Sequence, residues 1–348
     1  MPAHRTLLHS ARAITAILFS ALTILGATSQ RCSASDHGSR VSSPAPHPQD
    51  DAASPHAAEG TYDKAIFQKP IPADQMAFLS HFSGARSSDL AQDKQFRKLM
   101  HHVIPDCTFH YGSDMPMTDA LDMVFRASRY PVQVRDGRYL LLAGDSGPYL
   151  AGRGFLWVDM VDGVGLGGFY FRPTNGEPTP TVTVFSRQVK EKTLRLSQLP
   201  PAFVDQLRSW SSDFRIPVIT TRYFITGGNE KILLEHDEDF CTPADPTFTA
   251  PTDCEQMNAD AADIDMNAAY YLDQTHHATN ATAWMIVSND QVAWVRVRDD
   301  TCRSGPDPLK CRVRMTHDHI HTLTGAPSTP HTPHAQLKFV PTGVPADA

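Results

Sequence analysis

The chain has 348 residues, of which 41% are hydrophobic and 20% charged, with 27 prolines and 20 glycines. This length and mixture exclude a coiled coil, a disulfide-rich mini-protein and a fully disordered chain, and they fit one or two hydrophobic cores. The formal net charge is −7; without residues 1–34, which hold three arginines and no acidic residue, 28 basic side chains face 38 acidic ones, a net charge of −10. Such a balance argues against a nucleic-acid partner, which requires clustered cations, and permits a basic protein partner.

Residues 1–34 have the pattern of a signal peptide. A basic, polar stretch up to Arg12 precedes an apolar run from Ala13 to Ala27, and small residues follow. The run is too short to span a hydrocarbon core of about 30 Å. We therefore expect cleavage, after Ser29 or after Ala34, and a periplasmic or secreted protein that has no membrane contact once the signal is removed.

Composition divides the rest of the chain. Residues 35–60 consist largely of Ser, Ala, Pro, His and Asp, and residues 325–348 are rich in proline, so we expect a disordered leader and a disordered tail. Between them, residues 61–241 and 242–324 differ in pattern and are expected to form two domains.

Residues 61–241 combine strand patterns with two helix patterns. Apolar residues at spacings of three and four predict a helix over Met117–Ser128, and a second helix over Leu199–Trp210 has Ser197 as its expected cap. The remaining apolar runs are separated by Asp-Gly, Asn-Gly and Gly-Gly-Asn turns, which are typical of hairpins; these predicted strands are Pro131–Arg135, Arg138–Leu142, Phe155–Val161, Val164–Arg172, Thr181–Val189, Ile216–Thr226 and Lys231–Glu235. The expected fold class is α+β, an antiparallel β-meander with two helices.

Residues 242–324 predict a small helical domain. Apolar residues repeat at helical spacing from Met257 to Tyr271, and a third helix is expected over Arg312–Leu323. Between them, Ser288 and Gln291 have the spacing of a capping box, which predicts that a second helix begins there and runs to about Asp299. Short helices of this kind need tertiary packing and disulfides to persist.

Six cysteines suit an oxidising compartment, although cleavage after Ala34 would remove Cys32 and leave five. A disulfide between Cys302 and Cys311 is favoured because a turn-rich loop, Ser304–Pro308, separates them. The alternative, that these two pair separately with Cys241 and Cys254, stays open, because sequence alone does not choose among the pairings.

Motifs for catalysis or cofactor binding are weak throughout. Gly144–Pro148 resembles the nucleophile loop of trypsin-like proteases, but one glycine is missing and no base for Ser146 is evident, so a polar turn is the favoured interpretation. In His317–His321 only the first and last histidines share a helix face, which is a weak metal signature. The acidic run Glu235–Asp239 lacks the glycine and alternation of a calcium loop, so a solvated strand end is the favoured interpretation. We expect no enzyme activity, no metal and no cofactor.

The distribution of charge is the strongest functional signal. No Lys or Arg occurs between Lys231 and Arg296, whereas twelve acidic residues do. Such a run raises the local negative potential and would speed encounter with a cationic protein. Solubility alone is the competing explanation.

Residues of the last third resemble the lysozyme inhibitor LprI-like family. The family has a helix with a Leu-Asn-x-x-Tyr pattern and a later helix with Gln-x-x-Trp, Arg-Asp and Cys; here the matching residues are Met266, Asn267, Tyr270, Gln291, Trp294, Arg298, Asp299, Cys302, Cys311 and Thr316. A further family cysteine is absent, and His319 stands where an arginine is usual. The resemblance covers about a fifth of the chain and implies a helical, disulfide-tied envelope module, in some members an inhibitor of lysozyme.

The motif residues have a structural interpretation of their own. Trp294 and Arg298 are one helical turn apart, so the guanidinium can lie against the indole while Asp299 forms an ion pair with it. We therefore expect Gln291, Trp294, Arg298 and Asp299 to act mainly as scaffold.

Together these observations predict an exported, non-catalytic envelope protein that binds a basic protein partner, and the family resemblance implies that this partner is a lysozyme. The residues expected to carry binding are Asp260, Asp263, Asp265 and Asn267. The alternative is an envelope hydrolase or carbohydrate-binding protein that uses aromatic residues of the first domain; these are Tyr149, Phe155, Trp157, Phe169, Tyr170 and Phe171.

Overall fold

The computed structural model describes residues 62–111, 113–146, 152–172, 180–242, 249–277 and 280–325. All of them belong to the second of two compact units into which the chain divides, residues 55–348. The predicted signal peptide, the leader and the tail after Gly325 lie outside the described residues, as do Cys32 and Tyr149. None of the described helices has the length and apolar character needed to cross a lipid bilayer.

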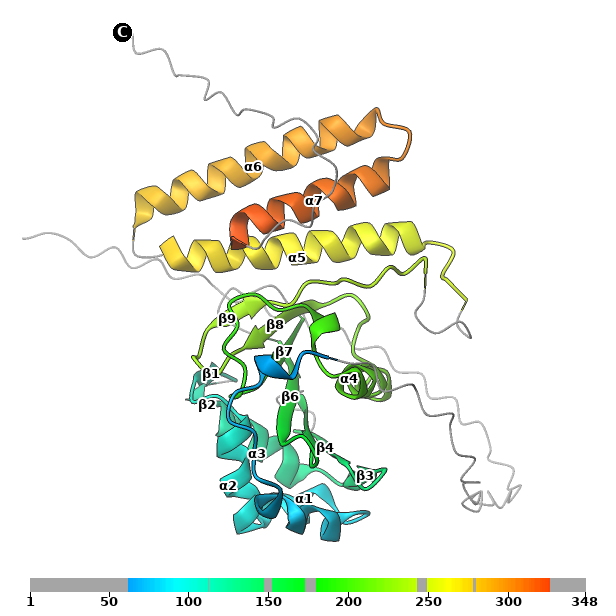
Figure 1. Ribbon diagram of the computed structural model, residues 1–348. Coiled ribbons are helices and arrows are strands. Elements are labelled where there is room, and N and C mark those ends of the chain that lie inside the picture. Colours follow the sequence, from blue (N-terminus) through cyan, green and yellow to red (C-terminus); the bar gives the residue numbers. More distant parts are fainter. Residues whose placement is uncertain are drawn as a thin grey trace, which may run out of the picture. The chain divides into compact units, whose positions relative to one another are not determined.

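A seven-stranded sheet forms the centre of residues 62–242 (Figure 1). Its strands, in spatial order, are β3 (Gln133–Arg135), β4 (Tyr139–Asp145), β5 (Arg153–Asp159), β6 (Val164–Phe171), β7 (Thr181–Phe185), β8 (Thr221–Ile225) and β9 (Lys231–Leu233). A separate two-stranded sheet consists of β1 (Thr108–His110) and β2 (Asp114–Pro116). The α+β class is therefore confirmed.

The order of the large sheet follows from its connections. Tight turns join β3 to β4 and β5 to β6, and in the first of them Asp136 and Gly137 both have positive φ, as a two-residue hairpin turn requires. Between β7 and β8 the chain passes through helix α4 (Pro201–Asp213), and this longer crossover makes the pair parallel. The sheet is thus mixed, and the purely antiparallel meander was wrong for this one pair.

Four helices, not two, accompany the sheet in the described residues. They are α1 (Ser87–Gln92), α2 (Lys94–Val103), α3 (Met117–Ala127) and α4. Asp93 starts α2, because its carboxylate accepts hydrogen bonds from the backbone N–H groups of Gln95 and Phe96. Four short 3-10 helices complete this part, at Lys64–Ile66, Ala73–Gln75, Ala77–Phe82 and Leu196–Gln198. Ser197 lies in the last of these, so it does not cap α4 as predicted.

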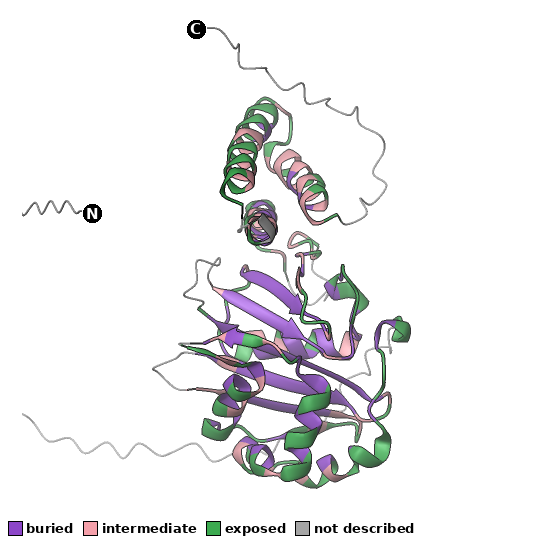
Figure 2. Ribbon diagram, turned by 90° about the vertical axis from the view of Figure 1, so that its left-hand side faces the viewer, coloured by how far each residue is buried: buried purple, intermediate pink, exposed green. Residues whose placement is uncertain are grey.

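The sheet is buried on both faces (Figure 2). Along β4, Leu140 and Leu142 join the core shared with α1, α2 and α3, whereas Leu141 and Ala143 join the core shared with α4. Close packing requires glycine on β6: a Cβ at Gly168 would lie 2.4 Å from the ring of Phe155. The two cores explain why the strands read as continuous apolar runs.

Three long helices follow the sheet: α5 (Cys254–His277), α6 (Ala281–Arg303) and α7 (Pro308–Thr324). α5 lies nearest to β9 in Figure 1, and its residues Met266 and Leu272 pack with Tyr223 of β8 and Leu233 of β9. Disulfides join Cys302 to Cys311 and Cys241 to Cys254. The favoured pair is therefore confirmed, and Cys107 is a free thiol whose pKa burial raises.

One helix boundary corrects the sequence interpretation. α6 begins seven residues before Ser288, because the side chain of Asn280 accepts hydrogen bonds from the backbone N–H groups of Thr282 and Ala283. Ser288 instead lies inside the helix, where its hydroxyl accepts a hydrogen bond from Tyr270 of α5 at 2.8 Å. The capping box at Ser288 and Gln291 was therefore wrong.

A buried carboxylate at the turn after β5 provides a test of this fold. Asp159 is 1% exposed and accepts hydrogen bonds from Arg138 and from the backbone N–H groups of Val161 and Asp162. We expect Asp159→Ala to lower the free energy of unfolding by about 2–4 kcal/mol, because it leaves these donors without their acceptor. The exposed Asp205→Ala is the control and should change it by about 0.5 kcal/mol or less. Urea denaturation of both variants measures the difference, and equal losses would contradict the assignment.

Candidate functional site

The family-motif residues meet in the interior of the helical part. Arg298 of α6 is buried, and its guanidinium donates hydrogen bonds to Asp263 of α5 at 2.8 Å, to Thr316 of α7 at 3.1 Å and to Asp299 at 3.0 Å. The Cζ atom of the guanidinium lies 5.3 Å from the centre of the Trp294 ring. One side chain therefore contacts all three helices, and the predicted contacts of Arg298 with Trp294 and Asp299 are present.

The other two motif positions join the same cluster. The ring of His319 stacks on Trp294, with 3.9 Å between ring centres and 8° between the planes. The Nε2 atom of His319 donates a hydrogen bond to the side-chain oxygen of Gln291, at 2.8 Å. Burial, and then the charge of Arg298, lower the pKa of His319 to about 4, so the imidazole is neutral at neutral pH. Gln291 and Trp294 thus hold α6 against α7.

The acidic residues predicted to bind a partner do not share one surface. Asp260 and Asn267 are exposed on α5. Asp263 is held by Arg298 and by Arg312, whose pKa this carboxylate raises through hydrogen bonding. Asp265 is 0% exposed, so it cannot belong to an exposed acidic surface.

Several of the acidic residues that have no basic neighbour in the sequence acquire cationic partners in the fold. Glu238 pairs with Arg222 of β8 at 2.8 Å, and Glu255 pairs with Lys310 of α7 at 3.3 Å. Glu235 lies between two histidines of α7, with Nδ1 of His317 at 3.3 Å and Nε2 of His321 at 3.5 Å. Compensation therefore comes from residues that are distant along the chain.

Asp265 has a structural partner on the sheet side. Its two oxygens accept hydrogen bonds from the backbone N–H of His236 at 2.7 Å and from the imidazole Nδ1 of His236 at 2.8 Å. Both side chains are almost completely buried. The second ring nitrogen of His236, Nε2, is buried and has no hydrogen-bond partner among the described residues. This pair fixes the segment after β9 against α5.

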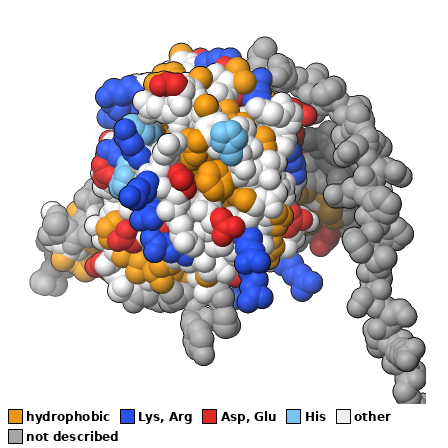
Figure 3. Space-filling model, turned by 90° about the horizontal axis from the view of Figure 1, so that it is seen from below, with side chains coloured by type: hydrophobic (Ala, Val, Ile, Leu, Met, Phe, Trp, Pro, Cys, Tyr) orange, Lys and Arg blue, Asp and Glu red, His pale blue; other side chains and the backbone are white. Residues whose placement is uncertain are grey.

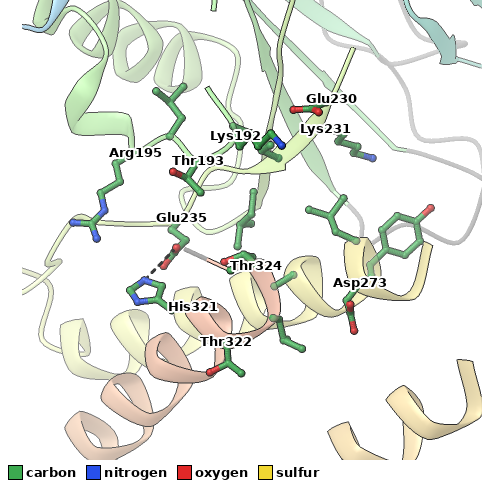
Figure 4. A pocket seen from close by; sticks show the side chains of 18 of the residues that line it. Lys192, Thr193, Arg195, Glu230, Lys231, Glu235, Asp273, His321, Thr322 and Thr324 are labelled. Carbon is green, nitrogen blue, oxygen red and sulfur yellow. Dashed lines mark ion pairs between the residues drawn. The ribbon is translucent and has the colours of Figure 1, made fainter. Parts of the chain in front are cut away.

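Two grooves flank this junction between the sheet and the helices. The first, which we call the strand-edge groove, has a volume of about 1140 Å³ and is lined by β9, by residues 192–198 and by the ends of α5 and α7. Figure 4 shows Arg195, Glu235 and His321 at one end of it and Lys231 and Asp273 at the other. Its acidic and basic side chains are equal in number among the lining residues, so this groove carries no strong charge of one sign.

The second groove, the acidic groove, has a volume of about 890 Å³. It is lined by segment 235–242, α5 and α7, and it shares Arg195, Glu235 and His321 with the strand-edge groove. Six carboxylates line it, at Glu235, Asp237, Glu238, Asp239, Glu255 and Asp318, against three Lys or Arg side chains. Sequence analysis assigned Glu235–Asp239 only as a solvated strand end, because the α5 and α7 walls lie far along the chain.

Hydrogen bonds and nearby charges lower the pKa of two carboxylates in this groove, Asp239 and Glu238. The pKa of Asp239 is lowered, first by a hydrogen bond from Asn258 and then by one from the backbone N–H of Cys241. For Glu238, burial opposes ionisation, but the charges of Arg222 and His236 and the hydrogen bonds to the carboxylate together outweigh burial and lower the pKa. Asp237 and Asp239 form no salt bridge with any residue that the structure describes. The groove therefore holds ionised carboxylates that a cation could approach.

The structure does not support a site at the aromatic residues of the first domain, at the protease-like loop or at a metal-binding cluster. Phe155, Trp157, Phe169, Tyr170 and Phe171 are all less than 7% exposed, so they form core and not a binding surface. Ser146 of the protease-like loop hydrogen-bonds to the hydroxyl of Tyr111 and to the backbone of Gly152, with no histidine among these partners. Within the described parts of the chain, no three His, Cys, Asp or Glu side chains are grouped to hold a metal ion.

A substitution at Arg298 tests the role of the motif cluster. We expect Arg298→Ala to lower the free energy of unfolding by about 3–5 kcal/mol, because it removes one partner of a buried ion pair. The control is Arg303→Ala, at an exposed ion pair on the same helix, which should lower the free energy of unfolding by about 0.5 kcal/mol or less. Chemical denaturation of the two variants separates the cases; a small loss for Arg298→Ala would contradict a structural role.

Comparison of the chain with protein-family models, with curated proteins and with solved structures finds no match in any of the three. The likeness to the LprI-like family therefore depends on the motif residues themselves, and the interpretation of the site depends on its geometry.

Proposed function

We propose that this chain is an exported, non-catalytic protein that binds a basic protein partner in the acidic groove. The observation that carries the proposal is the position of Asp237 and Asp239, which are exposed, lie in a groove with four further carboxylates and form no salt bridge with any described residue. Ionised carboxylates at a concave surface attract Lys and Arg side chains more strongly than a flat surface does, because the low-dielectric walls concentrate the field.

The site we propose differs from the one that the sequence suggested. Asp265 holds His236, and Asp263 holds two arginines, so neither is available to a partner. The acidic groove replaces them with Asp237 and Asp239 and with Glu255 at the start of α5, which stays exposed in its ion pair with Lys310. Asp260 is exposed on α5 outside the residues that line the groove.

Among the described residues on the opposite face of the molecule, acidic side chains do not gather in a comparable way. Figure 3 shows the side farthest from the three helices, where Lys and Arg side chains are spread among acidic and uncharged ones. A mixed surface of this kind gives little net attraction for either sign of charge beyond a Debye length, which is about 8 Å at physiological salt. A basic partner is therefore expected at the helical end.

Export is proposed from two independent features. The amino-terminal pattern is that of a signal peptide, and the described chain holds two disulfides, which persist in oxidising compartments. A lysozyme is the partner that we test first, because lysozymes are cationic envelope-directed proteins and the motif resembles that of the LprI-like family.

The decisive experiment measures binding of the chain without residues 1–34 to a cationic c-type lysozyme, by isothermal titration calorimetry at low and high salt. The test variant is Asp237→Asn, Asp239→Asn and Glu255→Gln combined. We expect it to weaken binding about 10-fold or more, since three exposed charge contacts contribute about 0.5–1 kcal/mol each. Binding by the unaltered chain should also weaken as salt increases.

A charge-matched control separates the groove from net charge. Asp74→Asn, Asp205→Asn and Asp290→Asn combined also removes three exposed carboxylates, all of them outside the groove. We expect its affinity to stay within about 2-fold of the unaltered chain, because distant exposed charges are screened. An equal loss in both triple variants, or no binding by the unaltered chain at low salt, would overturn the proposal.

A further inference from the structure

Helix α6 is held to the rest of the helical part by few buried groups. Of its described residues only Arg298 and Cys302 are buried, while Trp284, Met285, Ile286, Val292 and Val297 are exposed apolar side chains. The Cys302–Cys311 disulfide ties its last turn to the first turn of α7. Besides this covalent link, α6 contacts α7 through the stacked rings of Trp294 and His319 and through the hydrogen bond that Arg298 donates to Thr316.

This contact needs a neutral imidazole. His319 donates a hydrogen bond to the side-chain oxygen of Gln291, and its ring stacks on Trp294. The guanidinium of Arg298 lies beside the same tryptophan. The other charged groups at this seam are engaged elsewhere: α5 supplies Asp263 to Arg298 and Arg312, and α6 supplies Asp299 to Arg298. A second proton on His319 would place a new cation next to Arg298 with no carboxylate of its own, which is costly in a partly buried site.

On the opposite face of α7, protonation of a histidine strengthens a contact instead of weakening it. His317 and His321 contact Glu235, and the surrounding charged groups are His236 with Asp265, Glu238 with Arg222, and Arg195 and Asp318. Burial opposes protonation of His317, but the hydrogen bond and charge of Glu235, together with the charges of Asp265 and Asp318, outweigh burial and raise the pKa of the imidazole. Acid therefore retains the contact between α7 and the segment after β9.

We propose that acidification releases α6 from α7, because a protonated His319 and Arg298 repel each other at the seam, while Glu235 keeps α7 on the sheet side and the Cys302–Cys311 disulfide acts as the tether. Acid thus weakens the contact of α7 with α6 at His319 and preserves the contact of α7 with Glu235. This inference does not depend on the proposed partner.

The sign and the pH window follow from linkage. The pKa of His319 is about 4 in the packed seam, against an ordinary value of 6.5. Its contribution to packing is therefore complete above about pH 6.5 and is lost as the pH falls toward 4. Over that window the equilibrium constant for release of α6 should increase on the order of 10²-fold.

The test uses the chain labelled with 5-fluorotryptophan, observed by ¹⁹F NMR from pH 7 to pH 3.5. Four resonances are expected, and Trp294→Phe assigns the one of interest. We expect the Trp294 resonance to move to a solvent-exposed shift between pH 6.5 and 4, while those of Trp157 and Trp210, buried in the sheet core, stay in place. Movement of all three together would mean global unfolding and would overturn the proposal.

Two non-titrating variants complete the experiment. His319→Gln keeps a hydrogen-bond donor for Gln291, and His319→Tyr keeps a ring on Trp294; at least one should fold and should abolish the change in the Trp294 resonance. His317→Gln is the matched control on the opposite face of α7 and should leave the transition in place. An unchanged transition in the folded His319 variants, or no transition in the unaltered chain, would refute the release of α6.

Discussion

The buried guanidinium of Arg298 is the interaction on which the helical part of this protein depends. Its donors reach a carboxylate on α5, a carboxylate on α6 and a hydroxyl on α7, so each helix loses a partner if the charge is removed. A buried charge is costly unless it is paired and hydrogen-bonded, and this one is satisfied only when all three helices are assembled. The arrangement therefore specifies which helices pack together, and it converts Asp263 from a surface acid into a structural group.

The same logic operates at the junction with the sheet. Asp265 holds the backbone and the ring of His236, and Glu235 lies between His317 and His321. These contacts position segment 235–242 against α5 and α7 and so form the walls of the acidic groove. The buried carboxylate of Asp265 thus helps to position the segment on which the exposed carboxylates of Asp237 and Asp239 lie. Scaffold and proposed binding site are built from one run of acidic residues.

Local pattern was sufficient where local physics decides. Asp136-Gly137 adopts the positive φ values that its turn requires, the apolar spacing of residues 117–128 gives α3, and Cys302 is paired with Cys311 across a short loop. The contact between Trp294 and Arg298 also follows from helical spacing. By contrast, Ser288 and Gln291 matched a capping box but lie inside α6, because Asn280 caps the helix earlier and the tertiary contact with Tyr270 uses the serine hydroxyl.

From its sequence alone the chain specified an α+β protein with a disulfide-tied helical end, a tryptophan–arginine contact and an excess of acidic residues, since all of these depend on neighbours within a few turns or on composition. Only the tertiary structure decided that β7 and β8 run parallel, that Asp263 and Asp265 are interior, and that segment 235–239 faces α5 and α7. The physical reason is that a charge is satisfied by whichever partner the fold brings to it, and Arg312 and His236 lie 49 and 29 residues from the aspartates they contact.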